Sequence, residues 1–347
     1  MDAAQVNVLG ESLISPHTRT LNMLISDATW STNCCVIGDR MEWKPLAWML
    51  HEKTRIEKLD KLRLVMCESR LANHVKQTIR QMFRDIEIEF HDLLMPGIYP
   101  IYLDAQDMAK KYRSVDRVDP MYYSVGTMRL NRFLLVDWLQ KNKARNFGHP
   151  VLSDKELKVI LHPLSRLCKK DFSDYENVNR RFFGDCHVDT YWQKHVDLLL
   201  KAKIGIVTEQ PLFDYVERFY SEKLIHPIAS KTLPFFIGNK NDNENIRELG
   251  FQPYIGFDYS AESISNVVER WQAILDANKK FLLDDDHSTQ IFQKNSDIIQ
   301  HNYSVLIETD WKQKAVDEVL RLPQSVRDFL ETHFLNKKPP TIASQGH

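Results

Sequence analysis

The chain has 347 residues and a formal net charge of −1, from 46 Lys and Arg against 47 Asp and Glu. Its 43% hydrophobic and 27% charged residues are typical of a globular protein and exclude the fibrous and disordered classes. The near-neutral charge also argues against a protein that coats nucleic acid, because that binding depends on a large basic excess. At about 100–200 residues per domain, this length predicts two domains.

Signals for secretion, for membrane insertion and for common nucleotide cofactors are missing from the sequence. The 11 glycines form neither G-x-G-x-x-G nor G-x-x-x-x-G-K-[ST], the dinucleotide and P-loop fingerprints. The five cysteines show no C-x-x-C spacing and fit reduced thiols better than a disulfide framework. The N-terminal residues lack a signal-peptide pattern, and no apolar run approaches the ~20 residues that span a bilayer. We therefore expect a cytoplasmic protein with no membrane segment.

Short apolar runs alternate with longer amphipathic stretches, which is typical of an α/β fold. In the first third of the chain, helical spacing predicts helices over residues 43–50 and 71–83. The expected strands there are residues 21–26, 62–67, 86–90 and 98–103. The charged run 110–120 ends in proline and indicates a linker, so that one domain spans residues 1–115 and a second spans 121–320.

The same alternation begins again after the linker. The expected strands are residues 121–126, 157–162, 204–207 and 234–238, and the expected helices are residues 129–143, 189–201, 260–277 and 316–334. Residues 321–347 are expected to form a C-terminal helical end and a proline-rich, disordered tail. Tryptophans 43, 48, 138, 192, 271 and 311 stand among apolar neighbours at helical spacing, so we expect most of them to pack in the core rather than to stack on sugars.

One segment of the second domain carries most of the chemical signal. A buried strand is predicted to end at Thr208 and Glu209, where the carboxyl edge of a parallel sheet binds ligands. Ser221 is a good N-cap for a helix that Glu222 and Lys223 open. The N–H groups of a helix N-terminus and the charge of Lys223 suit a diphosphate, and either glutamate could bind ribose hydroxyls. The competing interpretation is a capped helix with a surface Glu–Lys pair.

The order of these residues resembles the C-terminal half of GT-B glycosyltransferases, in particular the fucosyltransferase-like enzymes and the related glycosyltransferases of large DNA viruses and tailed phages. The matching residues are Thr208-Glu209, Ser221-Glu222-Lys223-Leu224, Pro234-Phe235-Phe236-Ile237 and Leu249-Gly250-Phe251. Upstream, Ser124 followed by Arg129 and Arg132 resembles the strand–S–x–R stretch of the family. The resemblance covers residues 121–270, somewhat under half of the chain.

This resemblance implies two Rossmann-like domains that face each other across a cleft, with a C-terminal helix packing back on the first domain. It also implies transfer of a sugar from a nucleotide-sugar donor that the second domain holds. Lys223 and either Arg129 or Arg132 would bind the diphosphate, and Glu222 and Glu209 would bind the ribose or the donor sugar.

The sequence departs from the family pattern in three places. Ser221 stands where threonine is common, and serine keeps the helix cap. Pro253-Tyr254 follows Gly250-Phe251 where the family often has phenylalanine. The acidic E-S-Y-D stretch is reduced to Ala261-Glu262-Ser263-Ile264, which leaves the sugar specificity open.

The predicted mechanism needs no metal. Departure of a nucleoside diphosphate builds negative charge on its β-phosphate, and cationic side chains with a helix N-terminus stabilise that charge. We therefore expect a metal-independent enzyme without a bound cofactor, in which the nucleotide sugar is a co-substrate. The acidic cluster 284–287 is expected to be a solvated loop, and His187, Asp189 and His195 have a spacing that is unusual for zinc.

An inverting enzyme also needs a general base from the first domain, whereas a retaining enzyme does not. Asp27 is our first candidate, because it follows a predicted strand and precedes Trp30, which could stack on an acceptor. Glu68, Asp92 and Asp104 follow the other predicted strands. Taken singly, each of these acids is better explained as an ordinary loop residue or helix cap.

The acceptor is open between a glycan and a hydroxymethylated base in phage DNA. A DNA acceptor needs a basic face, and basic side chains are frequent between residues 53 and 84 of the first domain. Acidic side chains alternate with them, which favours a mixed solvated surface. The alternative function is a non-catalytic nucleotide-binding or scaffold protein of the same fold.

Overall fold

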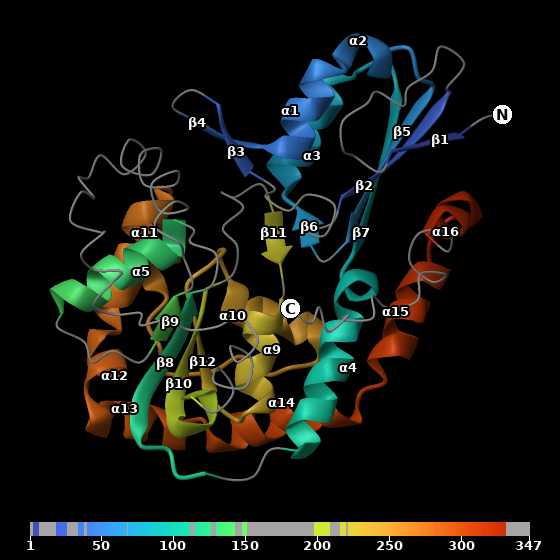
Figure 1. The fold of residues 1–347 in the computed structure, drawn as a ribbon. Helices are drawn as coiled ribbons and strands as arrows, with labels where there is room; N and C mark the ends of the chain where they lie inside the picture. Colours follow the sequence, from blue (N-terminus) through green and yellow to red (C-terminus); the bar gives the residue numbers. More distant parts are fainter. Residues whose placement is uncertain are drawn as a thin grey trace, which may run out of the picture. The chain divides into compact units, whose positions relative to one another are not determined.

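A computed structural model describes residues 3–6, 19–25, 34–37, 40–67, 69–111, 115–125, 130–142, 148–150, 198–208, 216–219 and 221–330. The protein is a mixed α/β structure with small parallel sheets, as expected (Figure 1). Its contacts divide the chain into two units. The first comprises Met1–Asn33, Trp43–Pro100 and Asp310–His347, and the second comprises Cys34–Glu42 and Ile101–Thr309.

The first unit is built on a parallel sheet with the strand order β1-β2-β5-β7 (Figure 1). These strands are β1 (Ala3–Val6), β2 (Thr20–Ile25), β5 (Lys61–Cys67) and β7 (Glu87–Leu93). Its other elements are α1 (Lys44–His51), α2 (Lys53–Ile56), β6 (Ser69–Leu71), α3 (Asn73–Met82), α15 (Trp311–Leu320) and α16 (Gln324–Leu330). The predicted strands 21–26, 62–67 and 86–90 and both predicted helices are therefore confirmed, with shifts of a few residues at their ends.

The C-terminal helices of this unit share a core with its sheet. Val319, Val326 and Leu330 pack with Val65 of β5 and Leu93 of β7, and all five side chains are buried. This packing removes apolar side chains of both strands from water, which stabilises the unit. Residues from opposite ends of the chain thus stabilise one unit.

The second unit contains a parallel sheet with the strand order β12-β10-β8-β9 (Figure 1). Its strands are β8 (Asp119–Val125), β9 (Gly148–Pro150), β10 (Ala202–Val207) and β12 (Leu233–Phe236). The short strands β3 (Cys34–Ile37) and β4 (Arg40–Trp43) pair with each other, and β11 is Val216–Phe219. The strands predicted at 121–126, 204–207 and 234–238 are confirmed, whereas 157–162 lies outside the described residues.

Helices and 3₁₀ turns make up most of the rest of this unit. They are α5 (Leu130–Lys141), α9 (Glu222–Ala229), α10 (Asp242–Asn245), η1 (Ile246–Leu249), η2 (Ser260–Ser263), α11 (Val267–Ala277), α12 (Lys279–Leu283), α13 (Asp285–Lys294) and α14 (Ser296–Glu308). Helices α5 and α11 lie side by side, and the indole Nε1 of Trp138 donates to Asp276 at 2.6 Å (Figure 1). Trp138, Trp271 and Trp311 are buried, so the packing role predicted for these three is confirmed.

Three predicted elements differ from the structure. Residues 98–103, expected as a strand, lie within helix α4 (Met95–Lys111), which crosses the division between the units. The buried side chains of α4 recur every three or four residues beyond the apolar run, and this longer period marks a helix. The helix expected at 316–334 is interrupted before Pro323, because proline cannot continue the backbone hydrogen bonds. The helix expected at 260–277 begins as the separate 3₁₀ turn η2.

An irregular segment between η1 and η2 is held by four asparagine side chains. Asn243, Asn278, Asn295 and Asn302 are all buried. Each accepts from the backbone N–H and donates to the backbone C=O of a single residue, namely Tyr254, Asp258, Ile255 and Gln252 respectively. A primary amide reproduces the donor–acceptor pair of a neighbouring strand, so this backbone is satisfied without a sheet.

Among the helices that the structure describes, none combines the length and the apolar character that crossing a bilayer requires.

Candidate functional site

The carboxyl edge of the second sheet brings together residues that the sequence singled out. Strands β10 and β12 are parallel, with Val207 opposite Phe236, and α9 connects back to β12. A helix that crosses between parallel strands runs antiparallel to them, so the N-terminus of α9 lies at the same edge as the end of β10. Thr208 directly follows β10 and is 1% exposed. Thr208 and the start of α9 therefore occupy one edge.

The start of α9 is capped as predicted. Ser221 has an extended backbone, and its Oγ accepts a hydrogen bond from the N–H of Lys223 at 3.2 Å. The ammonium of Lys223 lies 3.3 Å from the same Oγ and is only partly buried. A full positive charge therefore stands beside the partial positive charge of the helix N-terminus. Both favour an anion at this edge.

The loop after β12 continues this edge and is held rigidly. The N–H of Ile237 donates to Val207 O at 2.8 Å, which extends the pairing of β10 and β12 by one residue. The buried indole of Trp271 donates to Gly238 O at 2.7 Å. The carboxylate of Asp242, 2% exposed, accepts from the N–H of Asn239 at 2.8 Å. Asn239 and Asp242 were not predicted from the sequence, because no motif distinguishes N-K-N-D from an ordinary polar turn.

Residues 261–264 contribute the carboxyl group of Glu262, which accepts from the backbone N–H of Asn241 in the loop after β12. Burial raises the pKa of Glu262, against the lowering effects of the Asn241 backbone N–H and the nearby charge of Arg270. Arg270 is 1% exposed and donates to Ile264 O at 3.3 Å. A carboxyl group with a raised pKa in a partly buried position is a common feature of functional sites.

The structure places the predicted donor-binding residues as follows. Thr208, Ser221 and Lys223 all lie at the carboxyl edge, and Glu222 is the first residue of α9. Ser124 is the penultimate residue of β8, close to the carboxyl end of that strand, and Arg132 lies in α5. Arg129 and Glu209 lie outside the described residues.

The candidate general bases are mostly untested or displaced. Asp27 and Glu68 lie outside the described residues. Asp92 forms an ion pair with Lys76 and accepts from the N–H of Leu71 at 3.3 Å. Asp104 does not follow a strand, because it is an exposed residue in the middle of α4, and its candidacy at a strand end was wrong.

The basic stretch of the first unit is largely neutralised by acids. The ion pairs join Arg55 to Glu52, Lys53 to Glu57, Lys61 to Glu87 and Glu89, Arg63 to Glu89, and Lys76 to Asp92. The mixed surface predicted from the sequence is therefore confirmed for these residues. Cations that are paired with carboxylates attract the phosphates of a DNA backbone less strongly than unpaired cations do.

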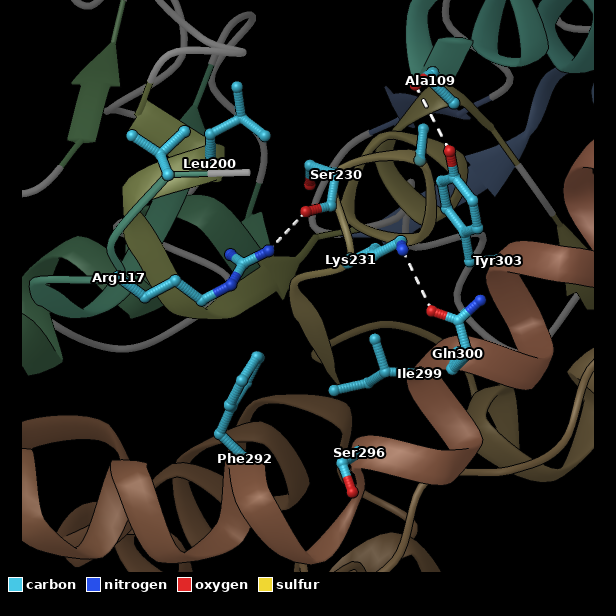
Figure 2. A pocket seen from close by; sticks show the side chains of 12 residues that line it. Ala109, Arg117, Leu200, Ser230, Lys231, Phe292, Ser296, Ile299, Gln300 and Tyr303 are labelled. Atoms are coloured by element: carbon cyan, nitrogen blue, oxygen red, sulfur yellow. Dashed lines mark hydrogen bonds between the residues drawn. The ribbon is translucent and has the colours of Figure 1, made fainter. Parts of the chain in front are cut away.

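A cavity in the second unit lies away from this edge. It measures about 300 Å³ and is lined by residues of the second unit that include Arg117, Lys231, Phe292 and Tyr303 (Figure 2). Arg117 precedes β8, and its guanidinium binds the carbonyl of Ala202 at the start of β10. The cavity therefore belongs to the amino edge of the sheet, opposite the predicted donor-binding residues.

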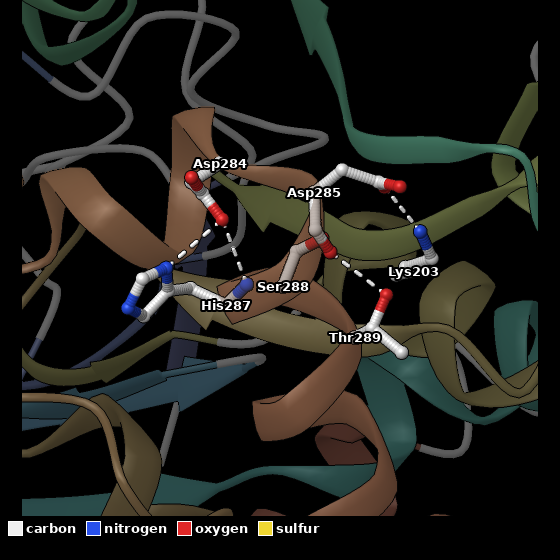
Figure 3. Close-up of polar contacts among 6 residues, drawn as sticks. All are labelled: Lys203, Asp284, Asp285, His287, Ser288 and Thr289. Atoms are coloured by element: carbon white, nitrogen blue, oxygen red, sulfur yellow. Dashed lines mark hydrogen bonds and ion pairs between the residues drawn. The ribbon is translucent and has the colours of Figure 1, made fainter.

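The acidic cluster 284–287 is not the solvated loop expected from the sequence. Asp284 caps helix α13, and its Oδ1 accepts from the backbone N–H and lies 2.9 Å from the ring Nδ1 of His287 (Figure 3). Asp285 forms an ion pair with the buried Lys203 of β10. The pair of Lys203 and Asp285 joins α13 to the sheet. No group of three or more potential metal ligands occurs among the described residues, and His187, Asp189 and His195 lie outside them.

Neither a protein-family model nor a curated protein sequence matches the chain.

Proposed function

We propose that the protein is a glycosyltransferase of GT-B architecture, which moves a sugar from a nucleotide-sugar donor to an acceptor hydroxyl without a metal. The observation that carries this proposal is the capped N-terminus of α9 with Lys223 at the carboxyl edge, next to the buried Thr208. This is where open parallel sheets bind phosphate groups. In this proposal the second unit is the donor-binding domain, and the protein acts in the cytoplasm.

The proposed chemistry follows from charge. The bond between the sugar C1 and the β-phosphate oxygen breaks, and its electron pair stays on the phosphate. Lys223 and the N–H groups at the start of α9 stabilise the negative charge that develops there. The acceptor oxygen forms the new bond to C1 and loses its proton, in an inverting enzyme to a base for which Asp27 and Glu68 are our candidates.

A glycan is the acceptor that we favour over a modified DNA base. Five cations of the first unit, Lys53, Arg55, Lys61, Arg63 and Lys76, are already paired with Glu52, Glu57, Glu89 and Asp92, which weakens the attraction for a DNA backbone. A DNA acceptor would in addition require the enzyme to flip the base out of the duplex, which costs a few kcal/mol.

The first experiment measures melting temperature with UDP, GDP, dTDP, CDP and ADP, each in magnesium and in EDTA. A nucleotide at about 100 times its Kd stabilises the fold by about 2.7 kcal/mol, which gives a clear shift. We expect one nucleotide to raise the melting temperature equally in both conditions. A shift that needs magnesium would contradict the metal-independent mechanism, and no shift with any nucleotide would contradict donor binding.

The variant Lys223→Ala tests the residue assignment. Because it removes a charge-assisted contact worth about 1.5–3 kcal/mol, nucleotide affinity should fall roughly 10–100-fold. Lys312→Ala is the matched control, since Lys312 holds the second position of α15, whose N-terminus is capped by Asp310. Loss of affinity in both variants would show a general charge effect. Nucleotide binding with no hydrolysis or transfer of any donor sugar would favour the non-catalytic alternative.

A further inference from the structure

The cavity at the amino edge of the second sheet has the chemistry of a separate binding site. Its walls come from the end of α9, from the segment before β8, and from α13 and α14 (Figure 2). At about 300 Å³, it lies at the lower end of the range for small-molecule pockets. Such a volume accommodates a small ligand such as one aromatic ring with an attached charged group.

Arg117 places a fixed cation in this wall. Its guanidinium donates to Leu199 O at 3.3 Å and to Thr232 Oγ1 at 2.9 Å, and also to the carbonyls of Ala202 and Ser230. All four described acceptors are uncharged, so they orient the guanidinium without neutralising it. Burial lowers the pKa of Arg117 to about 10, which still leaves the group charged at neutral pH.

Lys231 adds a second cation to the lining of the cavity. Its ammonium lies 4.2 Å from the centre of the Tyr303 ring and 3.0 Å from Gln300 Oε1 (Figure 2). Its backbone has a φ of 55°, a left-handed conformation that usually selects glycine after a helix. Glycine would adopt this conformation with less strain, whereas lysine places an amine in the lining of the cavity.

The remaining walls suit a flat apolar group beside an anion. The Phe292 ring lies under the Arg117 guanidinium, 5.2 Å from its carbon atom, and Tyr303 forms a second aromatic wall. Helix α14, thirteen residues long, begins at the lining residue Ser296 and directs its positive end to this region. The lining residues of the described chain include no aspartate or glutamate.

We infer that this cavity is a ligand site distinct from the carboxyl edge, and that it binds a small aromatic anion. Arg117 and Lys231 bind the carboxylate or phosphate, and the rings of Phe292 and Tyr303 contact the flat body of the ligand. The inference does not depend on the proposed transferase activity, because the two sites lie at opposite edges of one sheet and share no residue.

Binding of phenyl phosphate, benzoate, inorganic phosphate and benzyl alcohol to the full chain, measured by ligand-observed NMR and calorimetry, tests this inference. We expect phenyl phosphate, benzoate or both to bind. The compound with the higher affinity shows whether the site prefers a phosphate or a carboxylate. Inorganic phosphate lacks the ring and benzyl alcohol lacks the charge, so each should bind at least about tenfold more weakly. Equal binding of benzyl alcohol, or no binding of either aromatic anion at about 10 mM, would overturn the inference.

Two variants locate the binding. Lys231→Gln removes the second cation and should weaken the aromatic anion by about tenfold or more. Lys280→Gln is the matched control, because Lys280 also lies over a ring, 4.8 Å from the centre of Phe281, yet does not line the cavity. Unchanged affinity in Lys231→Gln would overturn the assignment, as would an equal loss in Lys280→Gln. Loss of binding in Lys223→Ala would instead place the anion at the carboxyl edge, which also overturns it.

Discussion

At the scale of the single residue, Lys231 has a left-handed backbone conformation that is unfavourable for any residue other than glycine. At its φ of 55°, a residue with a Cβ is strained and glycine is not. We predict that Lys231→Gly is about 1 kcal/mol more stable than Lys231→Ala, since both variants lose the amine and differ only in the backbone. Urea denaturation midpoints of the two variants measure this difference.

Lys294 provides the control for that comparison. It is the last residue of α13 and has the ordinary helical backbone. There the order should reverse, with the glycine variant less stable than the alanine variant by about 0.5–1 kcal/mol. The same order at both positions would contradict the strain argument for Lys231.

Glu89 makes the stability of the first unit depend on pH. Burial opposes ionisation of this carboxyl, but hydrogen bonds from Lys61 at 2.9 Å and Arg63 at 2.6 Å outweigh it and lower the pKa of Glu89 to about 2. A carboxyl with a lowered folded-state pKa stabilises the fold above its unfolded pKa of 4.5. That contribution is lost as the pH falls from about 4.5 toward 2.

We therefore predict that Glu89→Gln destabilises the fold by about 1 kcal/mol at pH 7, a value that allows for solvent screening. The difference from the unmodified protein should shrink as the pH is lowered to about 3, because below about 4.5 the carboxyl of the unfolded chain takes up a proton while the native carboxyl is still ionised. Melting temperatures across this range measure it. Glu87→Gln is the control, since Glu87 also pairs with Lys61 but is 60% exposed, and should show a smaller effect. A constant difference at all pH values would contradict the prediction.

At the scale of elements, the four buried asparagines supply the backbone hydrogen bonds that a neighbouring strand would otherwise supply. Asn243 binds both backbone groups of the buried Tyr254, at 2.8 and 3.0 Å. Asn302 binds those of Gln252, which is exposed to water. We predict that Asn243→Ala costs roughly 2–4 kcal/mol, because two buried polar groups lose their partners. Asn302→Ala should have a comparable cost, because water can replace the amide at the exposed Gln252 but not at the buried Tyr254 hydroxyl, which also hydrogen-bonds Asn302. Chemical denaturation of both variants measures these costs.

Close packing of α9 on β10 also depends on one residue. A Cβ at Gly205 would stand 3.2 Å from side-chain atoms of Leu199, Pro227 and Thr232. Each of these distances is shorter than a comfortable contact, so three neighbours would have to move together. The close approach of Pro227 of α9 to the strand therefore favours glycine in the middle of β10.

At the scale of the whole chain, Glu318 binds two residues that lie more than 220 positions before it in the sequence. Its Oε2 accepts from the N–H groups of Leu94 and Met95, both at 2.9 Å, and so caps the start of α4. Glu318→Ala should cost about 1–3 kcal/mol, because two buried donors lose their acceptor. Glu318→Gln keeps an acceptor oxygen and should cost less.

Asp317→Ala is the control for that prediction. Asp317 is exposed on the same helix, where it accepts from Gln313 at 2.8 Å, and its loss should change stability by less than about 0.5 kcal/mol. Equal melting temperatures for the Glu318 and Asp317 variants would show that the C-terminal helices do not depend on this cap.

The sequence by itself determined the α/β class, the strands β2, β5, β7, β8, β10 and β12, and the Ser221 cap of α9, because these depend on local periodicity and on neighbours within three or four residues. It also indicated the opposing charges that pair in the first unit. Local patterns misassigned residues 98–103, where a short apolar run fits a strand and a helix equally well and only the packing of α4 decides.

Only the tertiary structure revealed the asparagine pairs, the Glu318 cap and the cavity of Arg117 and Lys231. Their partners are separated by between 11 and 224 residues, so no local pattern identifies them. Arg117 looks like an ordinary linker residue in the sequence, and it acquires its role because parallel strands bring Leu199, Ala202 and Ser230 to one edge. Backbone groups from distant segments are brought together only by the fold, and so is the binding chemistry that they support.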